Sequence, residues 1–263
     1  MRTFPAAPLA LAAALALAAA LALPAAAQQP ADDGLLPPAA GEARAMTAEE
    51  VKEIALQAIL ENPEVVMEAV AILQERQARA EADAARAALS DNRDALERDD
   101  NAPVLGNPEG DVTVVEFFDY NCPYCRRAGA EVAALIAADP NVRVVYREWP
   151  ILGEESVVAA RAALASREQG LYPAFHEALM GQQIRLDEAL VMEVAAEVGL
   201  DVERLRADMD APEVQAHIDA SMELARSLGI NGTPAFVVAD ALAPGVVTAE
   251  ELARMVAAAR EDG

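Results

Sequence analysis

The spacing of apolar residues predicts a helical region between residues 47 and 98. Thr47 and Glu50 form the sequence pattern of a capping box, and apolar residues then follow every three or four positions. Asn62 and Pro63 predict a second helix start, with Asn62 as the N-cap and Pro63 in the first helical position. From there to the end of the region the chain contains neither Gly nor Pro, so we expect one long helix.

The apolar stripe of this region changes along its length, from bulky residues at the start to alanines at the end. Such a stripe needs a partner, because an isolated amphipathic helix gains little stability in water. It can fold back onto the rest of the chain or associate with further copies of itself. We favour self-association through residues 47–75, since the bulky residues lie far in sequence from the remaining apolar segments. The bulky positions are Val51, Ile54, Ile59, Val66, Val70 and Leu73.

After about residue 101 the pattern becomes that of an α/β domain. Residues 112–118 form a dense apolar run typical of a buried strand, and residues 143–146 predict a second, shorter strand. Residues 125–138 have helical spacing and lie between the two. This order is that of a βαβ unit, so we expect the two strands to be parallel.

The remaining part of the domain predicts a helical insertion and a return to the sheet. Residues 155–228 contain only helical patterns, and residues 235–238 predict a further strand. We expect a turn at residues 240–245 and a short edge strand at residues 246–247. Thr248 begins a second capping box, which predicts a final helix.

The N-terminal segment has the composition of a secretory signal peptide, with one basic residue, an Ala/Leu-rich run and an A-x-A pattern at residues 25–27. An uncleaved membrane anchor is the alternative, because the run is long enough to span a bilayer. The Pro- and Gly-containing stretch that follows predicts a disordered tether. We therefore divide the chain into a signal peptide (1–27), a disordered tether (28–46), a helical oligomerisation stalk with linker (47–100) and an α/β domain (101–263).

Composition excludes one large class of function. The chain has 44 acidic and 20 basic residues and a formal net charge of −24, so nucleic-acid binding is not expected. Hydrophobic residues make up 54% and aromatic residues only 4%, which favours a high helical content and a core of Leu, Val and Ile.

The two cysteines of the chain lie in the segment Cys122-Pro123-Tyr124-Cys125, between the first strand and its helix. Pro123 suits the first helical position, which makes Cys122 the N-cap and places Cys125 one turn inside. The free N–H groups and the helix dipole would then stabilise a thiolate at Cys122. A zinc site would need four ligands, and a structural disulfide across so small a loop would add little stability. We therefore favour a redox pair and expect no metal.

The sequence resembles a known family at these residues. The segment from Glu116 to Cys125 (EFFDYNCPYC) is similar to the active-site segment of DsbA-like thiol:disulfide oxidoreductases of the thioredoxin superfamily. Residues 232–236 (GTPAF) resemble the family's loop with a cis-proline. The resemblance implies an α/β thioredoxin-like domain with a helical insertion at about residues 155–228. Residues 61–66 are similar to the N-terminal helical region of the ScsC (suppressor of copper sensitivity) branch, whose members include trimers.

The resemblance also implies roles for individual residues. Cys122 would be the nucleophile, and Cys125 would resolve the mixed disulfide. Pro234 would follow a cis peptide bond beside the cysteine pair, and Thr233 would offer backbone groups to a bound polypeptide. Glu116 corresponds to the family's buried acid, which would accept or relay the proton of the resolving thiol. A solvent-facing edge position is the alternative for Glu116.

The positions of three further side chains predict their roles. Tyr124, between the cysteines, is expected to modulate the redox potential and to contact substrate. Trp149 is expected in the core or in the wall of a groove, and His176 on the surface.

Together these features predict an extracytoplasmic, periplasmic thiol:disulfide oxidoreductase without a cofactor. Its partners would be unfolded or misoxidised secreted proteins, a membrane redox partner and further copies of the chain, as a trimer. Thr233 before the proline and the expected oligomer favour a disulfide isomerase or reductase, and a dithiol oxidase is the alternative. An alternative of another class is a copper(I)-binding protein, which would use the cysteine pair and some of the eight Met residues.

Overall fold

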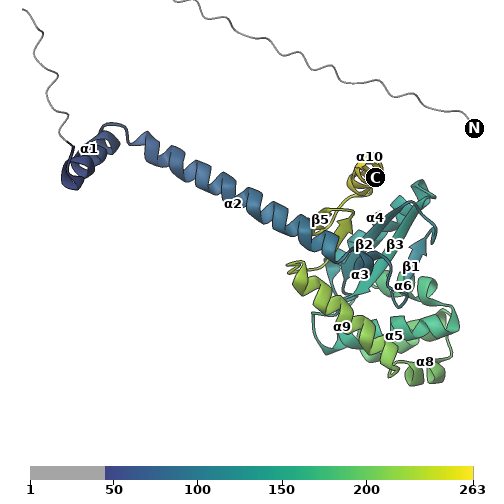
Figure 1. The fold of residues 1–263 in the computed structure, drawn as a ribbon. Coiled ribbons are helices and arrows are strands. Elements are labelled where there is room, and N and C mark those ends of the chain that lie inside the picture. Colours follow the sequence, from purple (N-terminus) through teal and green to yellow (C-terminus); the bar gives the residue numbers. More distant parts are fainter. Residues whose placement is uncertain (1–44, 263) are drawn as a thin grey trace, which may run out of the picture. The chain divides into compact units, whose positions relative to one another are not determined.

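A computed structural model describes residues 45–262, and it separates into two units between Asn62 and Pro63. The first unit holds one helix, α1 (Ala48–Glu61), drawn in purple in Figure 1. The predicted Thr47 capping box is confirmed. No helix of the described residues is long and apolar enough to cross a membrane. The predicted signal peptide and all but the last two residues of the predicted tether lie outside the described residues.

The second unit begins with two helices, α2 (Glu64–Asp91) and α3 (Arg93–Glu97). The predicted N-cap role of Asn62 is wrong. Its side-chain amide donates to the carbonyl of Ala58 at 3.0 Å and so ends α1, which leaves Pro63 as the cap of α2. The expected single helix also breaks, at Asn92, whose side chain donates to the carbonyl of Ala88 at 2.8 Å. In both places the side-chain amide of an Asn donates to a backbone carbonyl of the preceding helical turn and so competes with the backbone N–H groups of the helix.

The sheet has five strands in the order β1-β3-β2-β4-β5. They are β1 (Val104–Gly106), β2 (Val112–Phe118), β3 (Val142–Glu148), β4 (Ala235–Val238) and β5 (Ala241–Pro244). Strands β2 and β3 are parallel and are joined through α4 (Pro123–Ala138), which confirms the βαβ prediction. The expected edge strand at residues 246–247 is wrong, because β4 turns directly after Val238 and pairs with β5. Strand β1, which pairs with β3, was not predicted.

Helices make up the insertion between β3 and β4, as predicted. They are α5 (Glu154–Ala165), the 3-10 helix η1 (Ser166–Gln169), α6 (Tyr172–Met180), α7 (Glu188–Glu197), α8 (Val202–Asp208) and α9 (Pro212–Ser227). The last helix, α10 (Ala249–Asp262), follows the predicted Thr248 capping box. These helices cover both sides of the sheet (Figure 1).

Alternate residues of the central strand face two separate cores. Val114 and Phe118 of β2 pack with α4, α10 and the insertion helices. Val115 and Phe117 face the opposite core, which includes side chains from α2, α3 and α9. Trp149 lies in this second core with its ring edge-on to Phe117, 6.3 Å between centroids, as predicted for a core residue.

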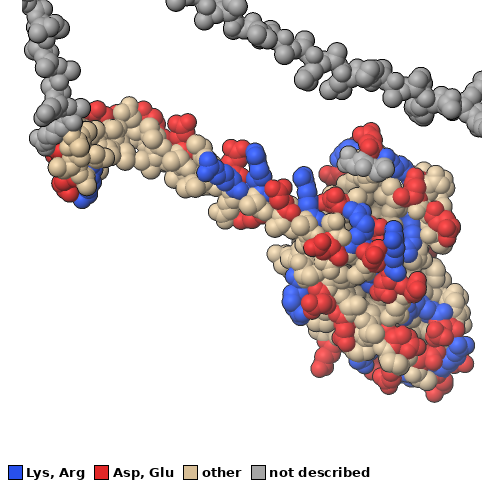
Figure 2. Space-filling view, viewed as in Figure 1, with Lys and Arg blue, Asp and Glu red and all other residues tan. Residues whose placement is uncertain are grey.

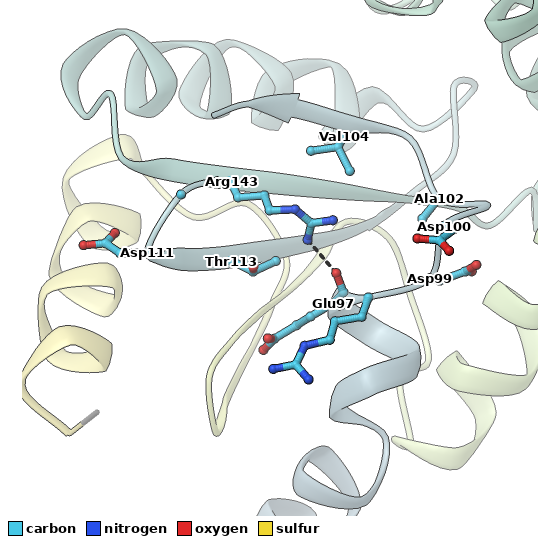
Figure 3. A pocket seen from close by; sticks show the side chains of 10 residues that line it. Glu97, Asp99, Asp100, Ala102, Val104, Asp111, Thr113 and Arg143 are labelled. Carbon is cyan, nitrogen blue, oxygen red and sulfur yellow. Dashed lines mark hydrogen bonds between the residues drawn. The ribbon is translucent and has the colours of Figure 1, made fainter. Parts of the chain in front are cut away.

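Two arginines of β3 hold the carbonyl end of α3 against the sheet. The fully buried Arg147 donates to the Asp99 carboxylate at 2.6 Å and to the Leu96 carbonyl at 3.2 Å. Arg143 donates to the Glu97 carbonyl at 2.5 Å, in the wall of a cavity of about 550 Å³ shown in Figure 3. The last carbonyls of α3 therefore have cationic partners from the domain.

Candidate active site

The cysteine pair lies where strand β2 passes into helix α4. Cys122 is the N-cap of α4, Pro123 is the first helical residue and Cys125 is the third, as the sequence predicted. Both thiols are free and buried. The strand-to-helix junction thus places two sulfurs on the first turn of a helix, where backbone N–H groups have no helical partner.

The surroundings of Cys122 favour its thiolate. As a thiol, Cys122 donates to the carbonyl oxygen of Thr233, with a sulfur-to-oxygen distance of 3.4 Å. Hydrogen bonds from the Cys125 thiol, from the side chain of Thr233 and from the backbone N–H groups of Cys125 and Tyr124 stabilise the thiolate and lower the pKa of Cys122 from 9.0 to about 5, although desolvation opposes them. A thiolate is the nucleophilic form, so Cys122 is the reactive thiol of the pair at neutral pH.

Cys125 has the opposite environment. Its side chain is fully buried, and burial raises its pKa far above the ordinary value. The hydrogen bond with Cys122 and the charge of Glu116 act in the same direction. One turn of helix therefore separates a thiolate from a protonated thiol.

Glu116 lies in the middle of β2, with Tyr146 of β3 and Phe236 of β4 as its neighbours in the sheet. It is fully buried, which excludes the solvent-facing alternative, and neither carboxyl oxygen has a hydrogen-bond partner. Burial raises its pKa from 4.5 to about 8, and the charge of Cys122 adds to the shift. A carboxyl group with this pKa can exchange a proton near neutral pH.

The loop before β4 completes the site. The peptide bond between Thr233 and Pro234 is cis, and the Thr233 carbonyl is the acceptor next to Cys122. Tyr124 lies on the solvent side, 56% exposed, with the Arg127 guanidinium 4.9 Å from its ring centroid. The structure thus brings Cys122, Cys125, Glu116 and Thr233 together around the first turn of α4.

Sequence reasoning missed a second buried carboxyl group, Glu148, at the end of β3. The hydroxyl groups of Tyr172 and Tyr120 donate to it at 2.8 and 3.2 Å, and Nδ1 of His176 lies 2.9 Å from the Tyr120 hydroxyl. Burial raises the pKa of Glu148 to about 8 and lowers that of His176 to about 3. The strand predicted at residues 143–146 ended before Glu148, whereas the observed strand includes it, so no signal like that of Glu116 was available in the sequence.

The expectation of a surface position for His176 is wrong, since only 5% of the residue is exposed. Tyr172 and His176 are four residues apart, so they share one face of α6, and this face turns toward Tyr146 of the sheet.

Comparison with known proteins relates most of the domain to one family. The family described as DSBA-like thioredoxin domain matches residues 113–257. A thioredoxin-like oxidoreductase from Silicibacter pomeroyi is 67% identical, covers 65% of this chain and 98% of its own, and superposes with a TM-score of 0.64. A linker-deletion variant of Proteus mirabilis ScsC is 27% identical, with a TM-score of 0.64, and covers 84% of this chain and 100% of its own.

Curated relatives include two kinds of protein. The thiol:disulfide interchange protein DsbA of Bordetella parapertussis is 30% identical over 143 residues, which are 52% of this chain and 68% of that protein. The Na⁺/H⁺ antiporter NhaA 3 of Salinispora tropica is 33% identical over 141 residues, 53% of this chain. The chain spans only 22% of the length of that antiporter.

Proposed function

The chain belongs to the DSBA-like thioredoxin domain family, and on this premise we propose that it exchanges thiols and disulfides in unfolded or misoxidised secreted proteins, outside the cytoplasm. The observation that carries this proposal is the contrast between the thiolate-favouring surroundings of Cys122 and the sealed position of Cys125. A structural neighbour from Salmonella enterica, 30% identical with a TM-score of 0.56, is described as a periplasmic thioredoxin-like protein, which supports the proposed location.

In the first step the Cys122 thiolate attacks one sulfur of a substrate disulfide. The substrate S–S bond breaks, a mixed disulfide forms with Cys122, and the second substrate sulfur leaves as a thiolate. The Thr233 backbone, next to the Cys122 sulfur, is placed to hold the substrate chain beside the new bond.

The mixed disulfide has two fates. If Cys125 gives its proton to the Glu116 carboxylate and attacks the Cys122 sulfur, the enzyme becomes oxidised and the substrate is reduced by two electrons. If another substrate thiolate attacks the substrate sulfur instead, Cys122 leaves as a thiolate and the substrate is isomerised without net oxidation. Glu116 is suited to the first route because its raised pKa allows it to take up a proton near neutral pH.

We place isomerase or reductase activity ahead of oxidase activity because of Thr233 and the proposed oligomer. One observation supports the oxidase as second candidate. A nucleophilic Cys with a pKa of about 5 stabilises the reduced form, which makes the disulfide form a stronger oxidant.

We further propose that residues 47–75 hold the protein in an oligomer, a trimer as the resemblance to the ScsC branch implies. No residue of α1 is buried, and of the residues of α2 only Leu89 is. Figure 2 shows uncharged side chains over much of α1 and the beginning of α2. Large apolar side chains are exposed on both helices, namely Val51, Ile54, Leu56, Ile59 and Leu60, and Val65, Val66, Met67, Val70, Ile72 and Leu73.

Apolar side chains exposed in such number on a helix are typical of an interaction site. Several Cys122 thiolates around one misfolded substrate would favour repeated exchange, and the crowding would keep an oxidising membrane partner away. Both effects favour isomerisation.

The proposed function is tested with two cysteine variants. Cys125→Ser should still attack substrates and accumulate mixed disulfides, whereas Cys122→Ser should lose all exchange. Mass spectrometry after incubation with a scrambled, multi-disulfide protein identifies the trapped cysteine. Trapping at Cys125 in the absence of Cys122 would reverse the assignment. Refolding of the scrambled substrate, compared with oxidation of the same substrate when reduced, separates isomerase from oxidase activity.

A further inference from the structure

Asp119, three residues before Cys122, joins the active-site turn to the segment that leaves β3. One oxygen of its buried carboxylate accepts from the backbone N–H groups of Ile151 and Leu152, both at 2.9 Å. The other oxygen accepts from the backbone N–H of Asn121 at 2.7 Å. A single carboxylate therefore fixes both the turn that carries Cys122 and residues 151–152.

Asn121 joins the same turn to the loop between α6 and α7. Its side chain accepts from the Leu186 N–H at 2.7 Å and donates to the Leu186 carbonyl at 3.1 Å. Arg185 of this loop donates to the Leu152 carbonyl at 2.9 Å. The two loops are thus bonded to the active-site turn and to each other, although they lie more than thirty residues apart in the chain.

Both loops present apolar side chains to solvent. Ile151 and Leu152 are each 40% exposed, and Ile184 is 64% exposed. With Tyr124 of the active-site segment they form a set of four exposed apolar residues, which we call the apolar rim. Outside α2, the only other large apolar side chains exposed in the described part of the second unit are Met222 and Val246. Exposed apolar surface in the domain is therefore concentrated on segments tied to the active-site turn.

We propose that Asp119 and Asn121 are positioning residues that set the substrate preference of Cys122, because they hold the apolar rim next to the reacting sulfur. This inference rests on the proposed function. The substrates favoured by such a rim are polypeptides whose reactive cysteine is flanked by large apolar residues, as in exposed core segments of unfolded proteins. Asp119 and Asn121 act on KM through the rim and do not touch the reacting atoms.

The test compares two peptides of equal length, each carrying one cysteine as a mixed disulfide with glutathione. One has Leu and Phe beside the cysteine, and the other has Ser and Asn. Asp119→Asn replaces one carboxylate oxygen by an NH₂ group, which cannot accept a hydrogen bond. The variant can therefore no longer accept from Asn121 with one side-chain atom and from residues 151–152 with the other. We expect kcat/KM for the apolar peptide to fall about tenfold, mainly through KM, since the lost contact is that of a large apolar side chain. For the polar peptide we expect a fall of less than about threefold.

Asp201→Asn is the matched control, because Asp201 caps α8 and Asn is an equally good cap. It should leave both rates unchanged. If Asp119→Asn does not fold, Ile184→Ser on the solvent-exposed rim takes its place and should show the same selective loss. Equal losses for both peptides, or no loss for either, would overturn the inference. Absence of exchange between the wild-type protein and both peptides would instead refute the proposed function.

Discussion

Apolar side chains of the same types are exposed on the helical arm formed by α2 and buried in the domain that follows it. Val70, on the arm, is 39% exposed, whereas Val115, in the central strand, is fully buried. The domain therefore obtains its stability from its own side chains, since its apolar strand residues lie in two closed cores. The apolar residues at the start of the arm contribute little to the stability of a single copy, and in the proposed oligomer they would be buried between copies.

The change from exposed to buried apolar side chains occurs near the end of α2. Leu89 near the end of α2 and Leu96 of α3 are the first buried residues of a domain core, together with Val115. Arg147 reaches out from β3 to the carbonyl of Leu96 and to Asp99. In the structure, the end of α2 and all of α3 thus belong to the domain's packing.

Two truncations should have the largest effects, because one removes only the exposed apolar residues and the other also removes buried ones. A chain that begins at Arg76 lacks the bulky apolar stripe but keeps Leu89, Leu96 and the partners of Arg147. We expect it to be a folded, redox-active monomer. A chain that begins at Asn101 loses the hydrogen-bond partners of the Arg147 guanidinium, namely Asp99 and the carbonyl of Leu96. It also loses the burial of two Leu side chains, which costs about 1.5–3 kcal/mol each.

Light scattering and urea unfolding measure both outcomes. The chain that begins at Asn101 should unfold at a much lower urea concentration than the chain that begins at Arg76, or fail to fold. Equal stability of the two chains would show that the arginine contacts with α3 contribute nothing to the domain.

A pair of valine substitutions makes the comparison at single residues. Val115→Ala should destabilise the domain by about 2 kcal/mol, because it opens a cavity in the central strand. Val70→Ala should leave the unfolding of the domain unchanged but weaken the oligomer. Since Ala is a better helix former than Val, such weakening would come from lost contacts between chains. Light scattering over a dilution series tests this, and a monomeric wild type at micromolar concentration would refute the oligomer.

The buried carboxyl groups should give the domain a characteristic pH dependence. In the folded protein the pKa of Glu116 is raised from 4.5 to about 8, so the folded state keeps a proton that the unfolded chain loses. Glu116 therefore contributes a fall in stability as the pH rises from 4.5 through about 8. Glu116→Gln should reduce this fall, and Glu68→Gln, on the exposed surface of α2, controls for the loss of one charge.

Urea midpoints between pH 4 and pH 9 provide the measurement, with both cysteines reduced throughout. Glu148 contributes a fall of the same sign, so the difference between the wild type and the Glu116→Gln variant isolates one group. Parallel curves would contradict a protonated Glu116 in the folded state.

Local signals explain what could be predicted from the sequence. Pro123 at a strand-to-helix junction was enough to place Cys122 at the N-cap of α4, because proline geometry acts on its immediate neighbours. The parallel pairing of β2 and β3 followed from the order of elements alone.

Contacts between distant segments explain what was missed. The partners of Arg147 lie about fifty positions away, and no local pattern indicates them. His176 looked like a surface residue because the sheet side chain that covers it, Tyr146, belongs to a strand thirty residues earlier. Strand β1 has only three residues, and its pairing with β3 defines it more than its own composition does.

The smallest expected effect concerns the capping boxes of α1 and α10, which have the same residue types. Thr47 with Glu50 at the start of α1 and Thr248 with Glu251 at the start of α10 form the same reciprocal hydrogen bonds. Helix α10 packs on the domain through buried residues, whereas α1 has none. The same lost hydrogen bond should therefore have different consequences.

Thr248→Ala should lower the free energy of unfolding of the domain by about 1 kcal/mol, the usual cost of losing such a cap. Thr47→Ala should leave this free energy unchanged and should only reduce the helical circular dichroism of the full chain, most visibly at dilutions where the oligomer dissociates. In an oligomer, burial between chains would hold α1 helical without its cap, so the loss of ellipticity should grow on dilution. A loss that does not depend on protein concentration would mean that α1 gains no stability from association, and the interface would then have to lie on α2.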